Sequence, residues 1–250
     1  MFKSVVLTLA LFAASPVLAQ SSLGIQGAEL RFGALQDEDG NAQSDFRLGL
    51  DVAITSAHGF QGDVILSDTD YGLIGQLGAH LYMDPVANQK YGVFATLADV
   101  DGRTMSWAAL GVEGMLALNS STTIQIQTGM GISDVNGLDF IFAGISSVHA
   151  ISSTAEIEGS LDLVEFDEAG FQAIAYDIGL SARYSPSGAP WGIYGNLTQS
   201  GLTGASGAPG ETRLGLGISW SLGASGGVSP TTRQFRSTDP VASLVRRDLW

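Results

Sequence analysis

The chain has 250 residues, no cysteine, and 11 basic against 25 acidic residues, which gives a formal net charge of −14. This balance argues against a nucleic-acid partner, whose phosphates require a basic surface, and the lack of cysteine excludes disulfides and thiolate metal sites. Charged residues make up only 14% of the chain, whereas a soluble domain carries about 25%. A chain with so little charge must hide its apolar surface in a way that a soluble domain does not.

The first 19 residues have the pattern of a secretory signal peptide. Lys3 provides a positive start, an apolar run covers residues 5–14, and Pro16 ends it. The small residue Ala19 predicts cleavage there, so the mature chain begins at Gln20. The alternative is a retained membrane helix, but the apolar run is too short to cross about 30 Å of hydrocarbon. We therefore predict a signal peptide over residues 1–19 and an exported protein.

Apolar and polar residues alternate from about residue 24 to residue 222, and helical spacing is almost absent. Successive side chains on a strand point to opposite faces, so each segment has one apolar face and one polar or small face. Turn residues between the segments predict about twelve strands. Their expected spans are 24–34, 43–56, 59–68, 71–83, 90–100, 103–117, 121–132, 137–149, 152–165, 170–184, 190–200 and 211–222.

Residues 20–222 are therefore predicted to form an all-β domain, a transmembrane antiparallel up-and-down β-barrel with short turns on both sides. Several runs exceed ten residues, which suits tilted strands that cross a membrane, and an even strand number places both termini on the periplasmic side. A soluble secreted β-barrel or sandwich would also alternate. It is disfavoured because the polar faces are mostly Gly, Ala, Ser, Thr and Gln, which is too little charge for an exterior in water.

Aromatic residues near the predicted strand ends suit a membrane–water interface, where part of the ring is dry and part is wet. Each one alone is equally compatible with ordinary packing. The candidate interface aromatics are Phe60, Tyr71, Tyr184, Trp191 and Trp220.

The connections at the two ends of the barrel differ in charge. Acidic residues concentrate in alternate connections, such as 36–43 and 165–170, and are nearly missing from the others. If the first strand runs outward, the acidic set faces the cell exterior. Carboxylates there could bind divalent cations and bridge to lipopolysaccharide, although Asp-Gly and Asn-Gly pairs also simply form turns. We assign no metal site.

The polar faces place carboxylates and a smaller number of arginines in the lumen. A wall lined mainly by one sign favours the passage of cations over anions. Alternatively the charges pair across the lumen and close it, and twelve strands lie between the filled eight-stranded barrels and the open porins. The candidate lumen-facing charges are Glu29, Arg31, Asp45, Arg47, Asp51, Asp63, Glu113, Glu156, Glu158, Asp162, Asp177, Arg183 and Arg213.

No catalytic residues are predicted. The histidines are His58, His80 and His149, and none lies in a nucleophile motif or in a paired metal-binding spacing. We expect no enzyme activity, no metal and no cofactor.

Residues 223–250 form a separate C-terminal region, because the alternation stops after Leu222. A flexible linker is followed by a predicted short helix that has Pro240 at its first position. Its apolar face consists of Val241, Leu244, Val245 and Leu249, and Arg246 and Arg247 lie near its end. The helix either enters the lumen, where arginines meet carboxylates, or stays in the periplasm; the alternative is an unstructured tail.

The signal peptide, the alternating Gly-rich strands and the final strand with Trp220 resemble the porin-like outer-membrane β-barrel superfamily of Gram-negative bacteria. The resemblance is architectural, covers about residues 20–222 and rests on no specific motif. It implies an outer-membrane location, contact with lipid and lipopolysaccharide, and insertion by the barrel-assembly machinery. Such barrels end in an aromatic residue, whereas here a tail separates Trp220 from the terminal Trp250.

The leading functional expectation is a narrow passive pore for small cationic or neutral solutes. The alternatives are a non-conducting barrel that anchors or stabilises the envelope and a soluble secreted barrel. The sequence leaves the solute and the oligomeric state open.

Overall fold

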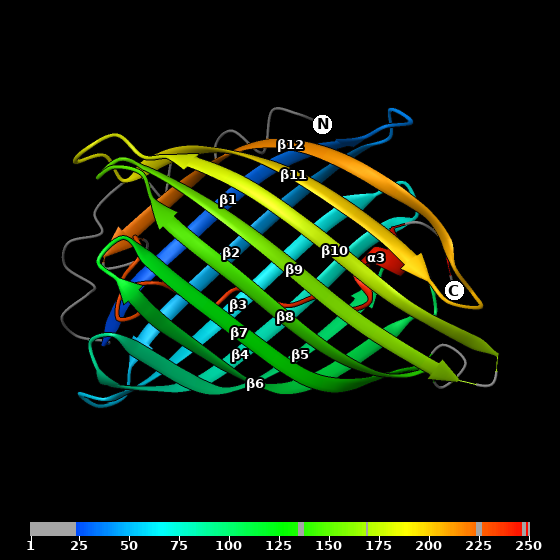
Figure 1. Ribbon diagram of the computed structural model, residues 1–250, viewed down its shortest axis with the longest axis horizontal. Coiled ribbons are helices and arrows are strands. Elements are labelled where there is room, and N and C mark those ends of the chain that lie inside the picture. Colours follow the sequence, from blue (N-terminus) through cyan, green and yellow to red (C-terminus); the bar gives the residue numbers. More distant parts are fainter. Residues whose placement is uncertain (1–23, 135–137, 169, 224–226, 247–248, 250) are drawn as a thin grey trace.

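The protein is a closed barrel of antiparallel strands followed by a C-terminal segment that folds back inside it (Figure 1). The computed structural model describes residues 24–134, 138–168, 170–223, 227–246 and 249. The predicted signal peptide and its cleavage point, together with Arg247 and Trp250, lie outside these residues.

The described residues form twelve strands, each hydrogen-bonded to its neighbours in the chain, and β1 closes the barrel by pairing with β12 from Gly27↔Gly223 to Asp37↔Arg213. The predicted barrel of about twelve strands is confirmed. Expected and observed boundaries differ by three residues at most, as where β6 begins at Ser106 rather than at residue 103. The strands are β1 (Ile25–Asp37), β2 (Ala42–Ala53), β3 (His58–Thr69), β4 (Gly72–Val86), β5 (Gln89–Val100), β6 (Ser106–Asn119), β7 (Thr122–Ser133), β8 (Asp139–Ala150), β9 (Ala155–Glu168), β10 (Phe171–Tyr184), β11 (Trp191–Thr203) and β12 (Ala208–Gly223).

Large apolar side chains cover the outside of the barrel, because the period of two directs one face of every strand outward. Leu110 and Leu216, for example, are 63% and 69% exposed. The same pattern continues around the barrel, with Val93 and Leu97 on β5 and Ile141 on β8 also exposed. The exterior is therefore apolar where the exterior of a soluble protein is polar.

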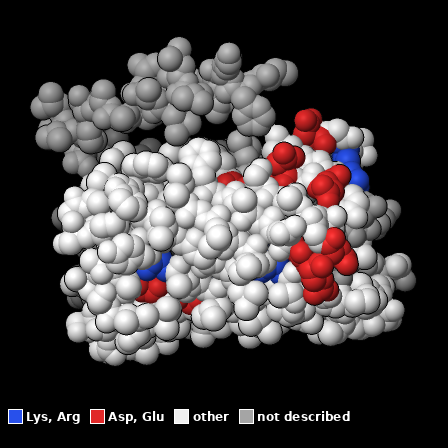
Figure 2. Space-filling model, turned by 90° about the horizontal axis from the view of Figure 1, so that it is seen from above, with Lys and Arg blue, Asp and Glu red and all other residues white. Residues whose placement is uncertain are grey.

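The two ends of the barrel differ in charge. We call the end where β1 begins and β12 finishes the terminal end, and the opposite end, with the connections after β1, β3, β5, β7, β9 and β11, the acidic end. Acidic side chains gather at one end of the face shown in Figure 2, and most of the remaining surface is uncharged. These side chains also build turns: Asp37 Oδ1 accepts hydrogen bonds from the amides of Asp39 (3.0 Å) and Asn41 (2.8 Å). Gly40, with a φ of 90°, supplies the left-handed residue of that turn.

One short helix, α3 (Ala242–Val245), lies in the C-terminal segment of the described residues. It is shorter than the predicted helix. No helix in the described part of the chain is long and apolar enough to span a membrane.

Candidate functional site: the lumen and the segment inside it

The C-terminal segment, residues 227–246, runs through the lumen from the terminal end toward the acidic end. Near the terminal end the hydroxyl of Thr123 donates to the carbonyl of Val228, and Thr231 Oγ1 donates to the carbonyl of Ala87 (3.3 Å). At the far end of the path, Leu244 packs in the apolar cluster that holds the acidic ends of several strands. The segment was predicted to lie either in the lumen or in the periplasm, and in the structure it lies in the lumen (Figure 1).

Amide side chains of the barrel wall bind the main chain of this segment. Gln61 holds both polar groups of Phe235, because its Oε1 accepts from the Phe235 amide (2.7 Å) and its Nε2 donates to the Phe235 carbonyl (2.9 Å). Gln76 Nε2 donates to the carbonyl of Thr238 (2.7 Å), and the amide of Arg236 donates to Gln125 Oε1 (3.1 Å). A buried main chain needs such partners, and the wall supplies them at residues 235, 236 and 238.

Phe235 fills a pocket between strands β3, β4, β5 and β6. Its ring stacks on His80 (centroids 5.9 Å apart, planes 6° apart) and meets Tyr82 edge-on at 5.9 Å. Met115 belongs to the same buried cluster. Lys90 has no exposed surface, and its ammonium lies 4.9 Å from the centroid of the Phe235 ring and 3.8 Å from that of Tyr82. We refer to His80, Tyr82, Lys90 and Met115 as the Phe235 pocket.

Two arginines on either side of Phe235 meet carboxylates of β9. Arg236 forms a two-pronged ion pair with Asp162, at 2.7 Å (Nη1–Oδ2) and 2.5 Å (Nη2–Oδ1). Arg233 reaches Glu158 at 2.8 Å and Glu156 at 3.5 Å. The planar guanidinium is suited to this paired geometry, so the basic side chains of the segment lie where the wall is acidic.

Toward the acidic end, part of the lumen wall is lined by apolar side chains. Phe94, Phe140, Phe142 and Phe166 face inward and are buried with the α3 residues Leu244 and Val245. Val241 joins this cluster and Leu249 packs against it. The apolar face predicted for the tail helix is therefore in contact with the wall.

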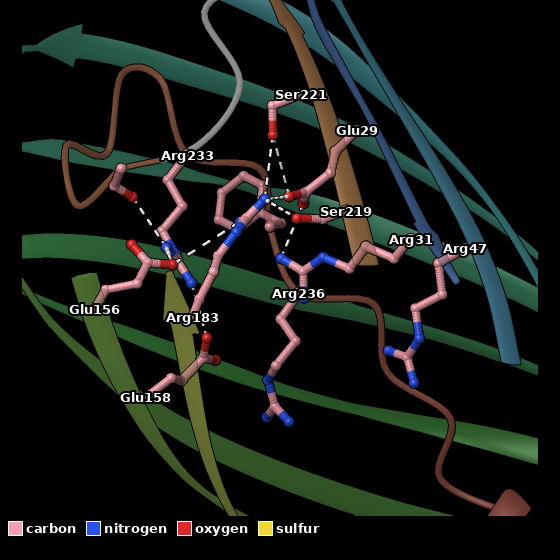
Figure 3. A network of polar contacts seen from close by, with 12 residues as sticks. Glu29, Arg31, Arg47, Glu156, Glu158, Arg183, Ser219, Ser221, Arg233 and Arg236 are labelled. Carbon is pink, nitrogen blue, oxygen red and sulfur yellow. Dashed lines mark hydrogen bonds and ion pairs between the residues drawn. The ribbon is translucent and has the colours of Figure 1, made fainter. Parts of the chain in front are cut away.

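The opposite wall, formed by β10–β12, β1 and β2, remains partly open. Two cavities of about 250 and 230 Å³ share Arg31, Arg47 and Arg183 in their linings. Arg183 is the centre of the network in Figure 3, where it pairs with Glu29 and donates to Ser219 (3.0 Å) and Ser221 (3.2 Å). The segment thus lies against one wall and leaves space along the other.

Each carboxylate predicted to face the lumen lies within ion-pair distance of a basic side chain. Three of them face arginines of the C-terminal segment, and the others face arginine, lysine or histidine side chains of the wall. The pairs are Glu29 with Arg31 and Arg183, Asp45 with Arg47, Asp51 with Lys90, Asp63 and Glu113 with His80, Glu156 with Arg183 and Arg233, Glu158 with Arg233, Asp162 with Arg236, and Asp177 with Arg213.

Several residues of this site were not predicted from the sequence. Lys90 has the inward parity of β5, so the alternation alone was sufficient to place it in the lumen. Arg233, Phe235 and Arg236 lie in a stretch without periodicity, which gave no signal for a bound conformation. The inward phenylalanines had a signal, because residues 140–142 (FIF) are apolar at both parities, as expected of a strand buried on both faces.

The candidate interface aromatics all lie on the exterior, from 36% exposed for Trp220 to 48% for Tyr184. Trp191 pairs with Trp220 across β11 and β12 near the terminal end. Tyr91, which is not among the predicted interface aromatics, is exposed at the same end, at the start of β5.

Among the described residues, no histidine forms the serine–histidine pair of a hydrolase. His80 lies between two carboxylates, 2.8 Å from Asp63 Oδ2 and 2.7 Å from Glu113 Oε1. His58 and His149 contact threonine hydroxyls near the terminal end. Among the described residues, no group of three or more His, Cys, Asp or Glu side chains is placed to hold a metal ion.

Comparisons with known proteins show which solved structures have a similar fold. No protein-family model matches the chain, and no curated protein matches it by sequence. Among solved structures, the NanC porin superposes with a TM-score of 0.60 at 10% identity, over 78% of this chain and 100% of that chain. An outer membrane channel from Pseudomonas putida F1 gives 0.58 at 11% identity, over 80% and 96%. The KdgM porin, in a complex with disordered oligogalacturonate, gives 0.53 at 10% identity, over 78% and 99%.

At these identities the likeness concerns the fold. The chain has the twelve-stranded barrel fold of outer-membrane porins, and the architectural resemblance predicted from the sequence is confirmed.

Proposed function

We propose that the protein is a bacterial outer-membrane channel that passes small cationic or neutral solutes. The observation that carries the proposal is the distribution of polarity: the exterior of a closed barrel is apolar, and the lumen holds charged side chains and open cavities. Lipid solvates such an exterior and water does not. A soluble secreted barrel of this kind would expose its leucines and isoleucines to water.

The preference for cations follows from the wall itself. The nine carboxylates predicted to face the lumen, together with Glu211, face four arginines, Lys90 and His80. Three of the carboxylates (Glu156, Glu158 and Asp162) pair with arginines of the C-terminal segment. When the segment leaves, the lumen keeps an excess of negative charge, which attracts cations and repels anions.

Planar-bilayer recording in a salt gradient tests this proposal. We expect discrete conductance steps and a reversal potential of the sign that marks cation preference. An anion-preferring potential would overturn the selectivity. Silence of the full chain and of variants with a loosened segment would favour the second candidate, a non-conducting structural barrel, which the filled half of the lumen supports.

The membrane location has its own test in the variant Leu216→Arg. Leu216 is midway along β12 and points outward, so a charge there enters the hydrocarbon core and costs about 2–4 kcal/mol. Leu118→Arg is the matched control, because Leu118 is also exposed but lies at the terminal end of β6, where the cost falls to about 0–1 kcal/mol. Equal unfolding free energies of the two variants in lipid vesicles would contradict a membrane-spanning barrel.

The remaining parts of this proposal concern export and partners. Cleavage of the signal peptide after Ala19 predicts that the mature chain begins at Gln20, which N-terminal sequencing of the membrane-extracted protein checks. Lipid and lipopolysaccharide around the apolar exterior, and insertion by the barrel-assembly machinery, belong to the same proposal.

A further inference from the structure

We propose that the wall of the lumen against which the C-terminal segment lies, β3 to β9, is a binding groove for an extended peptide with the pattern Arg-x-aromatic-Arg. We call it the covered wall, and the chain's own C-terminal segment occupies it and narrows the channel. Only one part of this inference, that the seated segment lowers conductance, rests on the proposed channel function. The groove itself stands on three independent sets of contacts.

The first set recognises a main chain rather than a particular side chain. Gln61, Gln76 and Gln125 bind the amide or carbonyl groups of residues 235, 236 and 238, and Lys90 Nζ donates to the carbonyl of Arg233 (3.2 Å). Contacts of this kind hold an extended peptide whatever its sequence, as a neighbouring strand does in β-augmentation.

The second set selects the side chains. The Phe235 pocket takes one aromatic ring and places the Lys90 ammonium beside it, an arrangement that favours an aromatic over an aliphatic residue. Glu158 and Asp162 take one guanidinium each, on either side of that ring. Asp63 adds a hydrogen bond from Ser237 Oγ at 2.8 Å. The order basic, aromatic, basic is therefore encoded in the wall.

The third set anchors the end of the segment. The side chains of Val241 and of the α3 residues Leu244 and Val245 cover phenylalanines that otherwise face the aqueous lumen. An inward aromatic patch at the mouth of a water-filled channel is explained by an apolar partner, and the structure shows that partner.

The segment is also placed so that it can leave. Arg236, Ser237, Ser243 and Arg246 border the cavity along the open wall, so the segment is packed on one side and faces space on the other. A tethered segment has a high effective concentration, and a free peptide of the same chemistry competes when the tethered one is weakened.

The test uses the full-length chain, which has no cysteine, with Ser243→Cys as a single reporter. Ser243 is 2% exposed in α3, so a maleimide labels the cysteine slowly while the segment is seated. Arg236→Glu and Asp162→Arg each place like charges where the ion pair was. We expect each to speed labelling about tenfold, the ratio that corresponds to about 1.4 kcal/mol. The double swap restores the pair and slow labelling, and Arg103→Glu at the acidic end is the control that leaves labelling unchanged.

Peptide binding separates a groove from a merely loosened tail. A fluorescent peptide with the sequence of residues 231–240 (TTRQFRSTDP) is expected to bind the Arg236→Glu variant, which keeps Asp162, and to bind Asp162→Arg at least tenfold more weakly. The same peptide with both arginines replaced by glutamate is the negative probe. Fluorescence anisotropy in detergent reads binding without any need for conductance.

The outcomes distinguish the two proposals. Binding and the labelling pattern in a silent barrel would uphold the groove and overturn the channel. Conductance that is the same in all variants, with unchanged labelling and no peptide binding, would uphold the channel and overturn the groove. Equal peptide binding by both single variants would also overturn the groove, because Asp162 then selects nothing.

Discussion

The two walls of the lumen face the same interior but are built for different contacts. The covered wall, β3 to β9, carries glutamines, aromatic rings, the buried Lys90 and the carboxylates of β9, and several of its polar groups bind the C-terminal segment. The open wall, β10 to β12 with β1 and β2, carries arginines paired with carboxylates and borders cavities. The covered wall thus contacts a peptide, whereas the charges of the open wall pair with one another beside unfilled space.

The largest effect is expected for Phe235→Ala on the covered side. The change empties the Phe235 pocket, and truncation of a buried phenylalanine costs about 3–5 kcal/mol. Labelling of the Ser243→Cys reporter is therefore expected to accelerate by about two to three and a half orders of magnitude. The matched control is Phe46→Ala, which removes an outward ring that contacts Phe32 at 4.9 Å. Similar labelling rates for the two variants would show that the contact of Phe235 with the covered wall does not hold the segment in place.

A smaller effect is expected from adding a methyl group to a glycine on each wall. A Cβ at Gly131 on β7 would lie 2.3 Å from the Phe140 ring and 2.5 Å from the carbonyl oxygen of Ala108, so the backbone must move. At Gly179 on β10 the close neighbour is the hydroxyl of Ser160 at 2.5 Å, which can rotate away.

Gly131→Ala is therefore expected to lower the free energy of unfolding by about 1–3 kcal/mol, and Gly179→Ala by less. Equilibrium denaturation of the refolded barrel by urea measures both. An equal loss in the two variants would show that the covered wall is packed no more tightly than the open one.

The same contrast explains how much of the molecule was predictable from its sequence. The barrel was predictable because apolar and polar side chains alternate with a period of two along a strand whose two faces have different surroundings. A slip of one residue would turn every side chain to the wrong face. The inward charges of β1, β2, β9 and β10 followed from the same parity.

The bound segment was not predictable in the same way. Residues 227–238 have no periodicity, and their conformation is set by Gln61, Gln76 and Gln125, which lie more than a hundred residues away in the chain. The sequence showed that arginines in the tail were available to meet carboxylates, but it indicated Arg246 and Arg247 rather than Arg233 and Arg236. An ion pair between distant segments depends on the path of the chain, which composition does not encode.

The smallest effect is expected from Arg183→Gln on the open wall. Glu29 keeps Arg31 at 2.9 Å and Glu156 keeps Arg233 at 3.5 Å, so no carboxylate loses its last cation and the barrel stays folded. The lumen becomes more negative by one charge beside the cavities. Two charges 4 Å apart interact by about 1 kcal/mol in water, so the ratio of cation to anion permeability is expected to rise by about fivefold or less. Reversal potentials of the variant and of the control Arg103→Gln measure the change; Arg103 lies at the acidic end over the ring of Tyr71.

Arg183 contacts the open wall and not the main chain of the segment, so the Ser243→Cys reporter in the Arg183→Gln variant should be labelled at its original rate. Faster labelling would mean that the two walls do not act separately.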